Sequence, residues 1–594
     1  MKTHLFFLVL ILSFYNCASQ AQTVYEPIHS SVYEFMDRMA QKGIIRFDDN
    51  IRPVPREYIA EKLEEFKIQN SKFKTSKLTE LEKEELEFYL KDYGMELAAI
   101  KKEKGRWLKV KDEKSNGGQS SVNINPQMNT ENTGDSQFTI QNSQLDTASS
   151  VTIIGKDPYG RYRLFSYSDN LFKLNVSPVL GYEMGTRDGA KYSHRWNGLY
   201  MYGYLGENIG YSFSFRDNSE DGTTIDKIKN FTPQTGIIIA KTDANNIQYS
   251  EVNVNIAYNW SWGDLSIGKD FLNWGYGQSG LLVLSDKAPS FPFIRLDVHP
   301  AKWLRFNYIH AWLNSDVIDS TSSYATLLPN QDRTIYRDKF LAQHTLTVTP
   351  YSGLDISLGE SIVYSDKLQV TYLTPIMFFR LADHYLSNAN NGAGGNSQFF
   401  VGISSRDQIK NTHLYGTLFI DELTLEGLFN AAKQRNQFGF TLGGSVTDLP
   451  VDNLTLTAEY TKIFPYVYTH YISTQTYQNS GYVMGHWMGN NADLIYGSVN
   501  YRFIRGLQAT LWGQYVRKGG QGPEQGQYIQ PQPPFLYGLR TNYSYLGAEV
   551  KYEITHELFA RLQYQTTKIS AQQVNLSFND SRVNEFYFAL YYGI

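Results

Sequence analysis

Residues that could do chemistry stand close together in two stretches. Gly277-Gln-Ser279-Gly280 approaches the G-x-S-x-G pattern of a nucleophile elbow but has the wrong spacing. Asp383, His384 and Ser387 form a set that a membrane hydrolase could use, although exposed loops collect such residues without purpose. The sequence contains neither an H-E-x-x-H pattern nor a phosphate-binding G-x-x-x-x-G-K-[ST] loop. We therefore expect no catalytic residue and no enzyme.

Metal and thiol chemistry are not indicated either. The 11 histidines are scattered, and no His/Asp/Glu cluster has the spacing of metal ligands, so we expect no metal and no cofactor. The only cysteine, Cys17, is a possible lipidation site, but the residues before it lack the small side chains of a lipobox. If the chain is cut after Ala21, the mature protein has no cysteine, which excludes disulfides and thiolate metal sites.

Binding of a saccharide has a better physical basis. Aromatic rings stack on the C–H faces of sugars, while Asn, Gln and Asp satisfy the hydroxyl groups. The stretches 464–491 and 527–537 contain that mixture. The candidate ligand-binding residues are Trp274, Tyr276, Tyr468, Tyr471, His486, Trp487 and Asn490. The alternative is that these rings are girdle residues or loop packing; for Trp274 and Tyr276, the neighbouring glycines favour a tight bend packed inside a lumen.

Two long alternating strands must position the bend at 273–280. From Val252 to Trp262 every second residue is large and apolar, and the residues between are Asn, Ala or Ser. Such a strand has one apolar and one polar face, and about ten tilted residues cross a bilayer core. A second strand is expected from Trp303 to Trp312. Aromatic rings near the strand ends fit the interfacial girdle of an outer-membrane barrel.

The composition also favours a barrel. Of the 594 residues 15% are aromatic and only 19% are charged, yet the mean hydropathy is -0.40. Lipid-facing and lumen-facing residues average out in this way along barrel strands. The net charge of -4 gives no reason to expect a nucleic acid partner.

The first part of the chain is expected to be exported and then helical. Residues 1–21 resemble a signal peptide, with Lys2 before a short apolar run and Ser19-Gln-Ala21 as the cleavage site. Residues 22–111 predict a three-helix periplasmic module, with capping boxes at Ser31-x-x-Glu34 and Thr79-x-x-Glu82. Its charged faces are expected to be solvated, although a docking module remains an alternative. Residues 112–159 are polar and predict a linker or material at a barrel rim.

The rest of the chain, 160–594, predicts a transmembrane antiparallel up-and-down barrel. Eight short turns alternate with long irregular stretches at 218–250, 314–340, 380–398, 464–494 and 517–536. The short turns are Gly206–Asn208, Gly263-Asp264, Pro300–Lys302, Tyr351–Gly353, Asp421-Glu422, Pro450–Asn453, Arg505-Gly506 and Thr555–Glu557. Short turns at one end and long loops at the other are typical of outer-membrane barrels. Eight short turns join nine hairpins, which predicts eighteen strands if both ends of the barrel chain are periplasmic; sixteen is the alternative.

The last strand supports closure of this barrel. Apolar residues alternate up to the end of the sequence, at Phe586, Phe588, Leu590, Tyr592 and Ile594. The pattern resembles the recognition strand read by the barrel-assembly machinery, which usually ends in Phe. A soluble sheet would blunt such an apolar edge with charge or proline. We therefore expect outer-membrane lipid and the assembly machinery as partners, in a Gram-negative bacterium.

Two stretches resemble the Wzi capsule-assembly family. Ser31 to Phe47, followed by Pro53 to Phe66, resembles the helix, turn and second helix at the start of that family. Asn273 to Leu296 resembles its W-G-x-G segment with the apolar run after it, and with the strand count the likeness spans nearly the whole mature chain. The Asn/Gln-rich segment 115–150 departs from better-known members.

The resemblance implies a monomeric barrel closed on the periplasmic side by a helical bundle. Members act as non-catalytic surface lectins that help to anchor capsular polysaccharide, so capsular polysaccharide or exopolysaccharide is the expected partner. The alternatives are a porin-like channel for small solutes or oligosaccharides, a barrel hydrolase, and a purely structural role. A helical module that occludes the lumen would disfavour the channel.

Overall fold

The computed structural model describes residues 23–72, 78–102, 149–390, 394–422, 436–522, 524–529 and 531–593. The expected signal peptide at 1–21, Cys17, most of the polar segment 112–159 and Ile594 lie outside these residues. Within the described part, no helix is long and apolar enough to cross a membrane.

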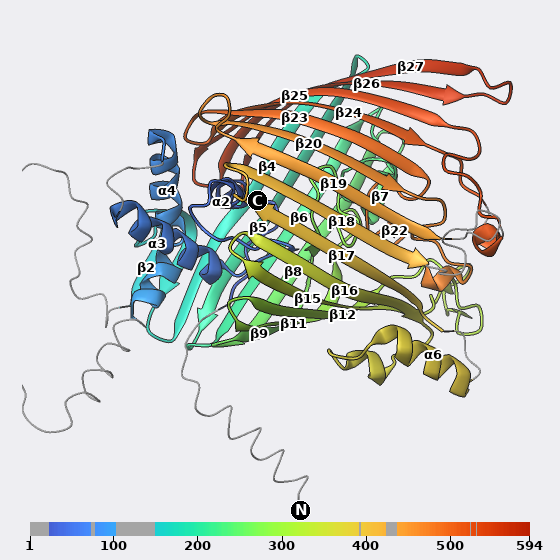
Figure 1. Ribbon diagram of the computed structural model, residues 1–594, viewed down its shortest axis with the longest axis horizontal. Coiled ribbons are helices and arrows are strands. Elements are labelled where there is room, and N and C mark those ends of the chain that lie inside the picture. Colours follow the sequence, from blue (N-terminus) through green and yellow to red (C-terminus); the bar gives the residue numbers. More distant parts are fainter. Residues whose placement is uncertain are drawn as a thin grey trace, which may run out of the picture.

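Eighteen antiparallel strands close into a barrel, which confirms the predicted fold and strand number (Figure 1). Each strand pairs with the next, and β27 pairs with β4 to close the ring. In order the strands are β4 (Phe172–Arg187), β5 (Ala190–Leu205), β6 (Ile209–Gly222), β8 (Asn246–Trp260), β9 (Gly263–Asp270), β11 (Phe291–Ala301), β12 (Leu304–Leu313), β15 (Lys339–Tyr351), β16 (Leu354–Ser365), β17 (Asn396–Arg406), β18 (Thr412–Glu422), β19 (Gln437–Thr447), β20 (Leu454–Ile463), β23 (Ala492–Ile504), β24 (Leu507–Lys518), β25 (Thr541–Thr555), β26 (Leu558–Gln572) and β27 (Phe578–Tyr592).

Shorter elements decorate this ring. They are the hairpin β2 (Ser150–Lys156) and β3 (Tyr162–Ser168), the strand β7 (Ile239–Asp243), the hairpins β13 (Tyr324–Ala325) with β14 (Asp332–Arg333) and β21 (Gln478–Asn479) with β22 (Tyr482–Val483), and the single-turn helices η2 (Val370–Leu373), η4 (Ser473–Gln475) and η5 (Glu524–Tyr528). The helix α6 (Phe379–Asn390) lies in the connection between β16 and β17.

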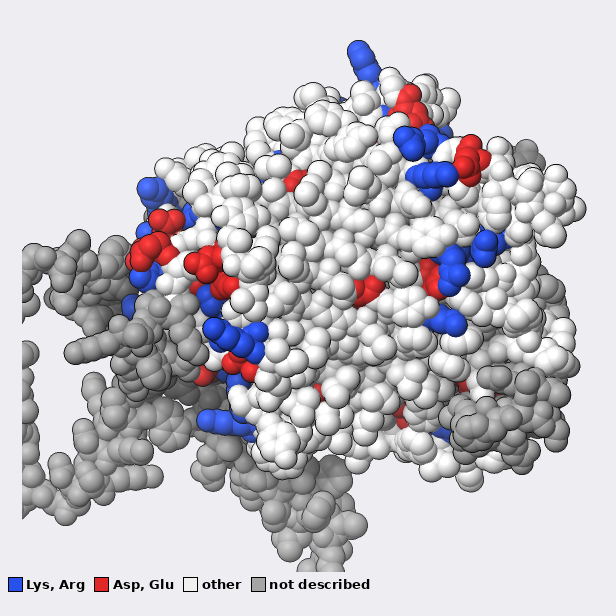
Figure 2. Space-filling view, turned by 45° about the horizontal axis from the view of Figure 1, so that its top comes forward, with Lys and Arg blue, Asp and Glu red and all other residues white. Residues whose placement is uncertain are grey.

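Alternation along the strands separates an apolar outside from a polar inside. On β8, Ile256 and Tyr258 face outward with 55% and 53% of their surface exposed, whereas Asn255 and Asn259 face the lumen and are each 3% exposed. Because side chains of a strand alternate between its faces, the period-two pattern in the sequence produces this arrangement. Figure 2 shows the outcome on one side of the molecule: charged side chains gather toward the ends and leave a broad, mostly uncharged band between them.

The predicted short turns lie together at one end of the barrel, with two exceptions. Gly263 and Asp264 are the first residues of β9, and the turn lies just before them at 261–262. Asp421 and Glu422 do not form a turn: they end β18, and the short connection lies before this strand at 407–411. The prediction was wrong because two adjacent acids resemble a turn, whereas the Asp421 carboxylate points into the lumen and accepts hydrogen bonds from the Tyr468 N–H (2.6 Å) and the Gln398 side chain (3.3 Å). The opposite end carries the long loops. We call the two ends the short-turn end and the long-loop end.

A helical module closes the short-turn end (Figure 1). It consists of α2 (Val32–Gln41), the short strand β1 (Ile51–Arg52), α3 (Arg56–Lys72) and α4 (Glu80–Asp92), and helical backbone continues at 94–102. The predicted capping box at Thr79 and Glu82 is present. The one predicted at Ser31 is wrong: its side chain makes no cap and instead donates to Glu553 of the barrel (3.2 Å). The helices share an apolar core that includes Phe35, Met36 and Leu63.

Candidate functional site

The connection between β9 and β11, residues 271–290, folds into the lumen. Its short strand β10 (Asn273–Trp274) pairs antiparallel with β1 of the helical module, with Trp274 opposite Ile51. The Gly275 N–H continues this pairing by donating to the Asn50 carbonyl (2.8 Å). The W-G-x-G segment is therefore the point inside the barrel where a loop from the wall meets the module.

A wall carboxylate fixes the second half of this bend. Glu459 on β20 accepts hydrogen bonds from the backbone N–H groups of Gln278 (2.7 Å) and Ser279 (3.0 Å). The Tyr415 hydroxyl donates to the same carboxylate (2.7 Å). A side chain at Gly277 would collide with the Gly280 carbonyl oxygen, which lies 2.1 Å from the position of its Cβ. Only a residue without a Cβ fits this tight bend, as its glycines indicated.

Two predicted site residues lie on the bend and have different surroundings. Trp274 is 1% exposed, and its indole N–H donates to the Thr345 hydroxyl of the wall (2.8 Å), so this ring is part of the lumen core. The Tyr276 ring meets His413 edge-on at 6.3 Å. The Tyr276 hydroxyl is buried, and among the described residues it has no hydrogen-bond partner.

A second loop, 464–491, enters the lumen from the long-loop end and packs on the bend. Tyr468 is buried, stacks on Tyr477 and donates from its hydroxyl to the Leu282 carbonyl (2.7 Å). The Trp487 indole N–H donates to the Ser279 carbonyl (2.7 Å). The two loops therefore stabilise each other, and the apolar core of the barrel lies inside its lumen.

The remaining predicted residues divide between core and surface. His486 is fully buried beside Trp487; burial lowers its pKa to about 3, so the imidazole is neutral. Asn490 accepts a hydrogen bond from Lys518 through its backbone carbonyl. Tyr471 is 55% exposed, and its ring contacts those of His470 and Tyr528. Its position in an aromatic-rich loop gave no indication of this.

A cavity of about 330 Å³ lies between the bend, the module and the wall. Of the seven predicted residues it brings together Tyr276 and Trp487. Sequence reasoning missed the other main members of its lining, which are Asp37, Asp49 and Arg52 of the module, Asp286 and Lys287 of the bend, and Arg406, His413 and Tyr415 of the wall. The wall residues stand at inward positions of β17 and β18. Alternation along a strand could have identified them, but only once it is known which of its two faces points into the lumen.

Paired charges form one side of this cavity. The Arg406 guanidinium lies 2.6 Å from Asp49 and 2.8 Å from Asp37. Burial alone would raise the pKa of Asp49, but the cations Arg406 and Arg52 outweigh it and hold that pKa well below its usual value. Burial, and then the neighbouring Asp49, raise the pKa of Asp37. The site is thus a polar cavity with aromatic faces, and on this side its charges are neutralised in pairs.

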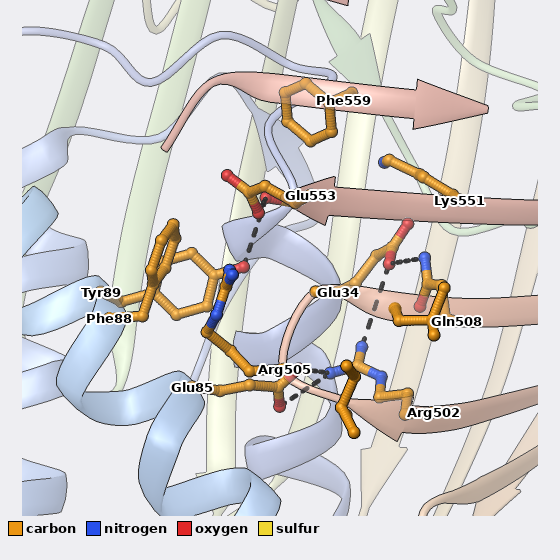
Figure 3. Close-up of a pocket in the computed structure, with 14 residues that line it drawn as sticks. Glu34, Glu85, Phe88, Tyr89, Arg502, Arg505, Gln508, Lys551, Glu553 and Phe559 are labelled. Carbon is orange, nitrogen blue, oxygen red and sulfur yellow. Dashed lines mark hydrogen bonds and ion pairs between the residues drawn. The ribbon is translucent and has the colours of Figure 1, made fainter. Parts of the chain in front are cut away.

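Ion pairs also join the module to the barrel rim. In Figure 3, Glu34 of α2 and Glu85 of α4 converge on Arg502 at the end of β23. The Arg502 guanidinium donates to Glu85 (2.9 Å), and Gln508 donates to Glu34 (3.0 Å). The space between them is about 30 Å³, which is the room of a single water molecule. This pocket is a packed seam and is too small for a sugar.

The possible catalytic set lies elsewhere. Asp383 is on α6, outside the barrel, where it is buried and accepts hydrogen bonds from the Gly395 N–H (2.5 Å) and the Tyr372 hydroxyl (3.3 Å). The neighbouring His384 is exposed. In the described ranges, no group of three or more His, Cys, Asp or Glu residues could hold a metal ion. The lumen cavity is therefore the candidate site.

Comparison with known proteins shows which family model and which solved structures this chain resembles. The family model described as capsule assembly protein Wzi matches residues 188–581. No curated protein matches the chain. The structure of Wzi from Escherichia coli, an outer membrane protein involved in group 1 capsule assembly and a carbohydrate-binding β-barrel, is similar with a TM-score of 0.50 at 12% identity, over 97% of this chain and 100% of that one.

Other barrels resemble the chain less. Acinetobacter baumannii OccAB2 has a TM-score of 0.40 at 12% identity, covering 71% of this chain and 97% of its own. Pseudomonas aeruginosa OpdK, solved with vanillate, has a TM-score of 0.40 at 13% identity, covering 70% and 98%.

Proposed function

The chain belongs to the Wzi capsule assembly family, and from that membership we propose that it is a non-catalytic, glycan-binding barrel of the outer membrane. In this role it takes part in the assembly or surface attachment of capsular or other extracellular polysaccharide. We also propose that it is exported, inserted by the barrel-assembly machinery, and active as a monomer.

The outer surface supports a place in the membrane. Outward residues such as Leu358, Leu562 and Leu546 are 57%, 42% and 62% exposed, and they are apolar on strand after strand. A soluble protein rarely leaves such a band uncovered. A closed ring also has no free strand edge, so every backbone group of the wall can be paired without water.

Closure of the lumen is the observation that carries the proposal. The module fills the short-turn end, and the pairing of β1 with β10 ties it to a loop that occupies the lumen. A molecule that enters from the long-loop end meets a packed core around Trp274 and Leu282, and the cavity beside this core is bounded by the module rather than open as a passage. Retention of a ligand fits this arrangement better than the alternative, a porin-like channel for solutes or oligosaccharides.

The lining of the cavity suits a sugar. Tyr276 and Trp487 supply aromatic faces, and Arg406 and Lys287 supply donors for hydroxyl or carboxylate oxygens. The unpartnered Tyr276 hydroxyl is a further donor and acceptor at the same place. Stacking and hydrogen bonds of this kind can hold a sugar without a chemical reaction.

A hydroxyl deletion tests the binding. Tyr276→Phe removes an atom without a partner in the described structure, so we expect an unchanged thermal midpoint and at least a threefold weaker affinity for extracellular polysaccharide purified from the producing bacterium. Tyr351→Phe at the short-turn end, where the ring is 71% exposed, is the matched control. Tryptophan emission of the purified protein reports binding. Equal affinity of the wild type, both variants and an unrelated barrel would contradict the proposal.

A further inference from the structure

One loop of the long-loop end folds over the outside of the barrel. Residues 366–390, here called the outer strap, follow β16 and form η2 and α6. Figure 1 shows α6 outside the wall beside β12 and β16, at the end away from the helical module. The strap covers outward-facing residues of the wall, which form an apolar cluster with it: Tyr308, Phe340, Ala342, Ile362, Tyr364, Tyr372, Phe379 and Ala382.

The covered wall is not purely apolar. Glu360 of β16, His344 of β15 and His310 of β12 alternate with inward residues and face outward under the strap. The strap supplies partners for two of them. Glu360 accepts hydrogen bonds from the N–H groups of Phe379 (2.8 Å) and Arg380 (2.6 Å) at the start of α6, and the His344 ring nitrogen Nδ1 lies 3.0 Å from the Pro375 carbonyl oxygen.

These polar residues continue the strand positions that carry the apolar outer band. On β16, Ile356 and Leu358 share the outward face with Glu360 and are 37% and 57% exposed, whereas Glu360 is 3% exposed. On β15, Leu346 is 41% exposed and lies two residues after His344, toward the short-turn end. The strap therefore begins where the exposed apolar side chains of the same strands end, toward the long-loop end.

The other side of the strap carries large apolar side chains beside the exposed Arg380 and His384. Ile376 and Phe378, which precede α6, are 83% and 46% exposed, and Leu381 and Tyr385 on the helix are 65% and 72% exposed. Water would leave these side chains without a favourable contact, whereas acyl chains next to the apolar band would supply one. A carboxylate and two imidazoles open to those acyl chains would be strongly unfavourable.

We propose that the outer strap is a lipid-contacting element of the wall, in which α6 lies against the acyl chains of the leaflet nearest the long-loop end. Its inner face seals Glu360, His344 and His310 from lipid, and its outer face, with Leu381 and Tyr385, replaces the wall as the lipid contact. This inference rests on the outer-membrane location proposed above and adds an element that strand alternation alone does not indicate.

The test uses single thiols that carry a bimane fluorophore. Cys17 is the only cysteine of the chain, so a Cys17→Ser background leaves one thiol at a chosen position. The positions are Leu381→Cys on α6, Leu562→Cys on the outer wall of β26, and Leu327→Cys in the long-loop hairpin, where the side chain is fully exposed. The full-length protein is reconstituted in phosphatidylcholine vesicles with and without brominated acyl chains.

The inference predicts that bromine lowers emission at position 381 by a factor within twofold of that at 562, while emission at 327 stays unchanged. If 381 behaves like 327 while 562 is quenched, the strap is not in lipid, although the barrel is. If 562 is not quenched, the membrane location fails and this inference fails with it. Tyr385→Cys repeats the measurement one helical turn away and must agree with 381.

Discussion

The Glu459 carboxylate holds Ser279, which is 180 residues away in the sequence, through the backbone N–H of Ser279 (3.0 Å) and its hydroxyl group. Glu459 stands on the wall and Ser279 on the bend that fills the lumen. This contact is therefore a direct link between the barrel and its plug. Its strength should decide how firmly the lumen is closed.

Glu459→Gln should weaken that link. The neutral amide offers one acceptor oxygen and turns a donor group toward the N–H groups of the bend. Leaving a buried N–H unsatisfied costs about 1–3 kcal/mol. We expect a lower thermal midpoint, measured by the change in tryptophan emission on heating in detergent. Asp332→Asn, the same change in an exposed hairpin, should leave the midpoint unchanged; equal midpoints of all three proteins would refute the role given to Glu459.

Arg406→Gln should loosen the helical module. Its guanidinium lies 2.6 Å from Asp49 and 2.8 Å from Asp37, and removing it leaves these two carboxylates with Arg52 as their remaining cation. Breaking a buried ion pair in this way costs about 3–5 kcal/mol. We expect faster cleavage of the module by added protease.

The matched change is Arg337→Gln. Arg337 pairs with Asp366 at the surface, where both side chains are about half exposed, and such pairs contribute about 0–1 kcal/mol. Cleavage of this variant should match that of the wild type. A module that is as resistant in Arg406→Gln as in Arg337→Gln would show that the ion pairs do not hold it.

Asp48 makes the docking of the module depend on pH. Burial raises the pKa of this carboxyl group to about 6, although Arg305, 2.5 Å away, opposes the shift. When folding raises a carboxyl pKa, the group contributes its full stability at pH values below its pKa in the unfolded chain. This contribution is lost as the pH rises through its pKa in the folded protein. Asp48→Asn removes the titration. Between pH 4 and 7 we expect the thermal midpoint of Asp48→Asn to rise relative to that of the wild type. A constant difference between the two midpoints across this range would contradict the role given to Asp48.

Glu360→Ala should release the outer strap while leaving the barrel intact. The carboxylate caps two N–H groups of α6 at 2.8 Å and 2.6 Å, and loss of a helix cap costs about 0.5–2 kcal/mol. We expect new proteolytic cleavage within 366–390, which gives two fragments on a denaturing gel, while the cut barrel keeps its mobility on a gel run without heating. Asp366→Asn, in the same strap but at the surface, is the control and should add no cleavage. Resistance of Glu360→Ala would show that apolar packing alone holds α6.

The strands of the wall and the helices of the module could be predicted because their patterns depend only on residues that are close together in the sequence. Alternation from Val252 to Trp262 and the apolar periodicity of α2 and α4 arise within a single element. The error at Asp421 arose because local composition does not distinguish a turn from a strand end whose acid faces the lumen.

The site depended on contacts that local patterns do not contain. The pairing of Ile51 with Trp274 joins residues far apart in the chain, and with it the module supplies Asp49 and Arg52 to the cavity. The same limit applies to Tyr471: its loop is rich in aromatic residues, but only the path of the chain decides that this ring is exposed while Tyr468 and Trp487 are buried.

The conductance of the intact protein in a planar lipid bilayer tests the central claim most directly. A barrel that is closed by its module and its lumen loops, and that retains a glycan rather than passing solutes, should insert without current steps in potassium chloride. Arg406→Gln, with its module loosened, should show intermittent openings in the same bilayer, which proves that the protein has inserted. Steady single-channel steps from the intact wild-type protein would contradict the account and favour a porin-like channel.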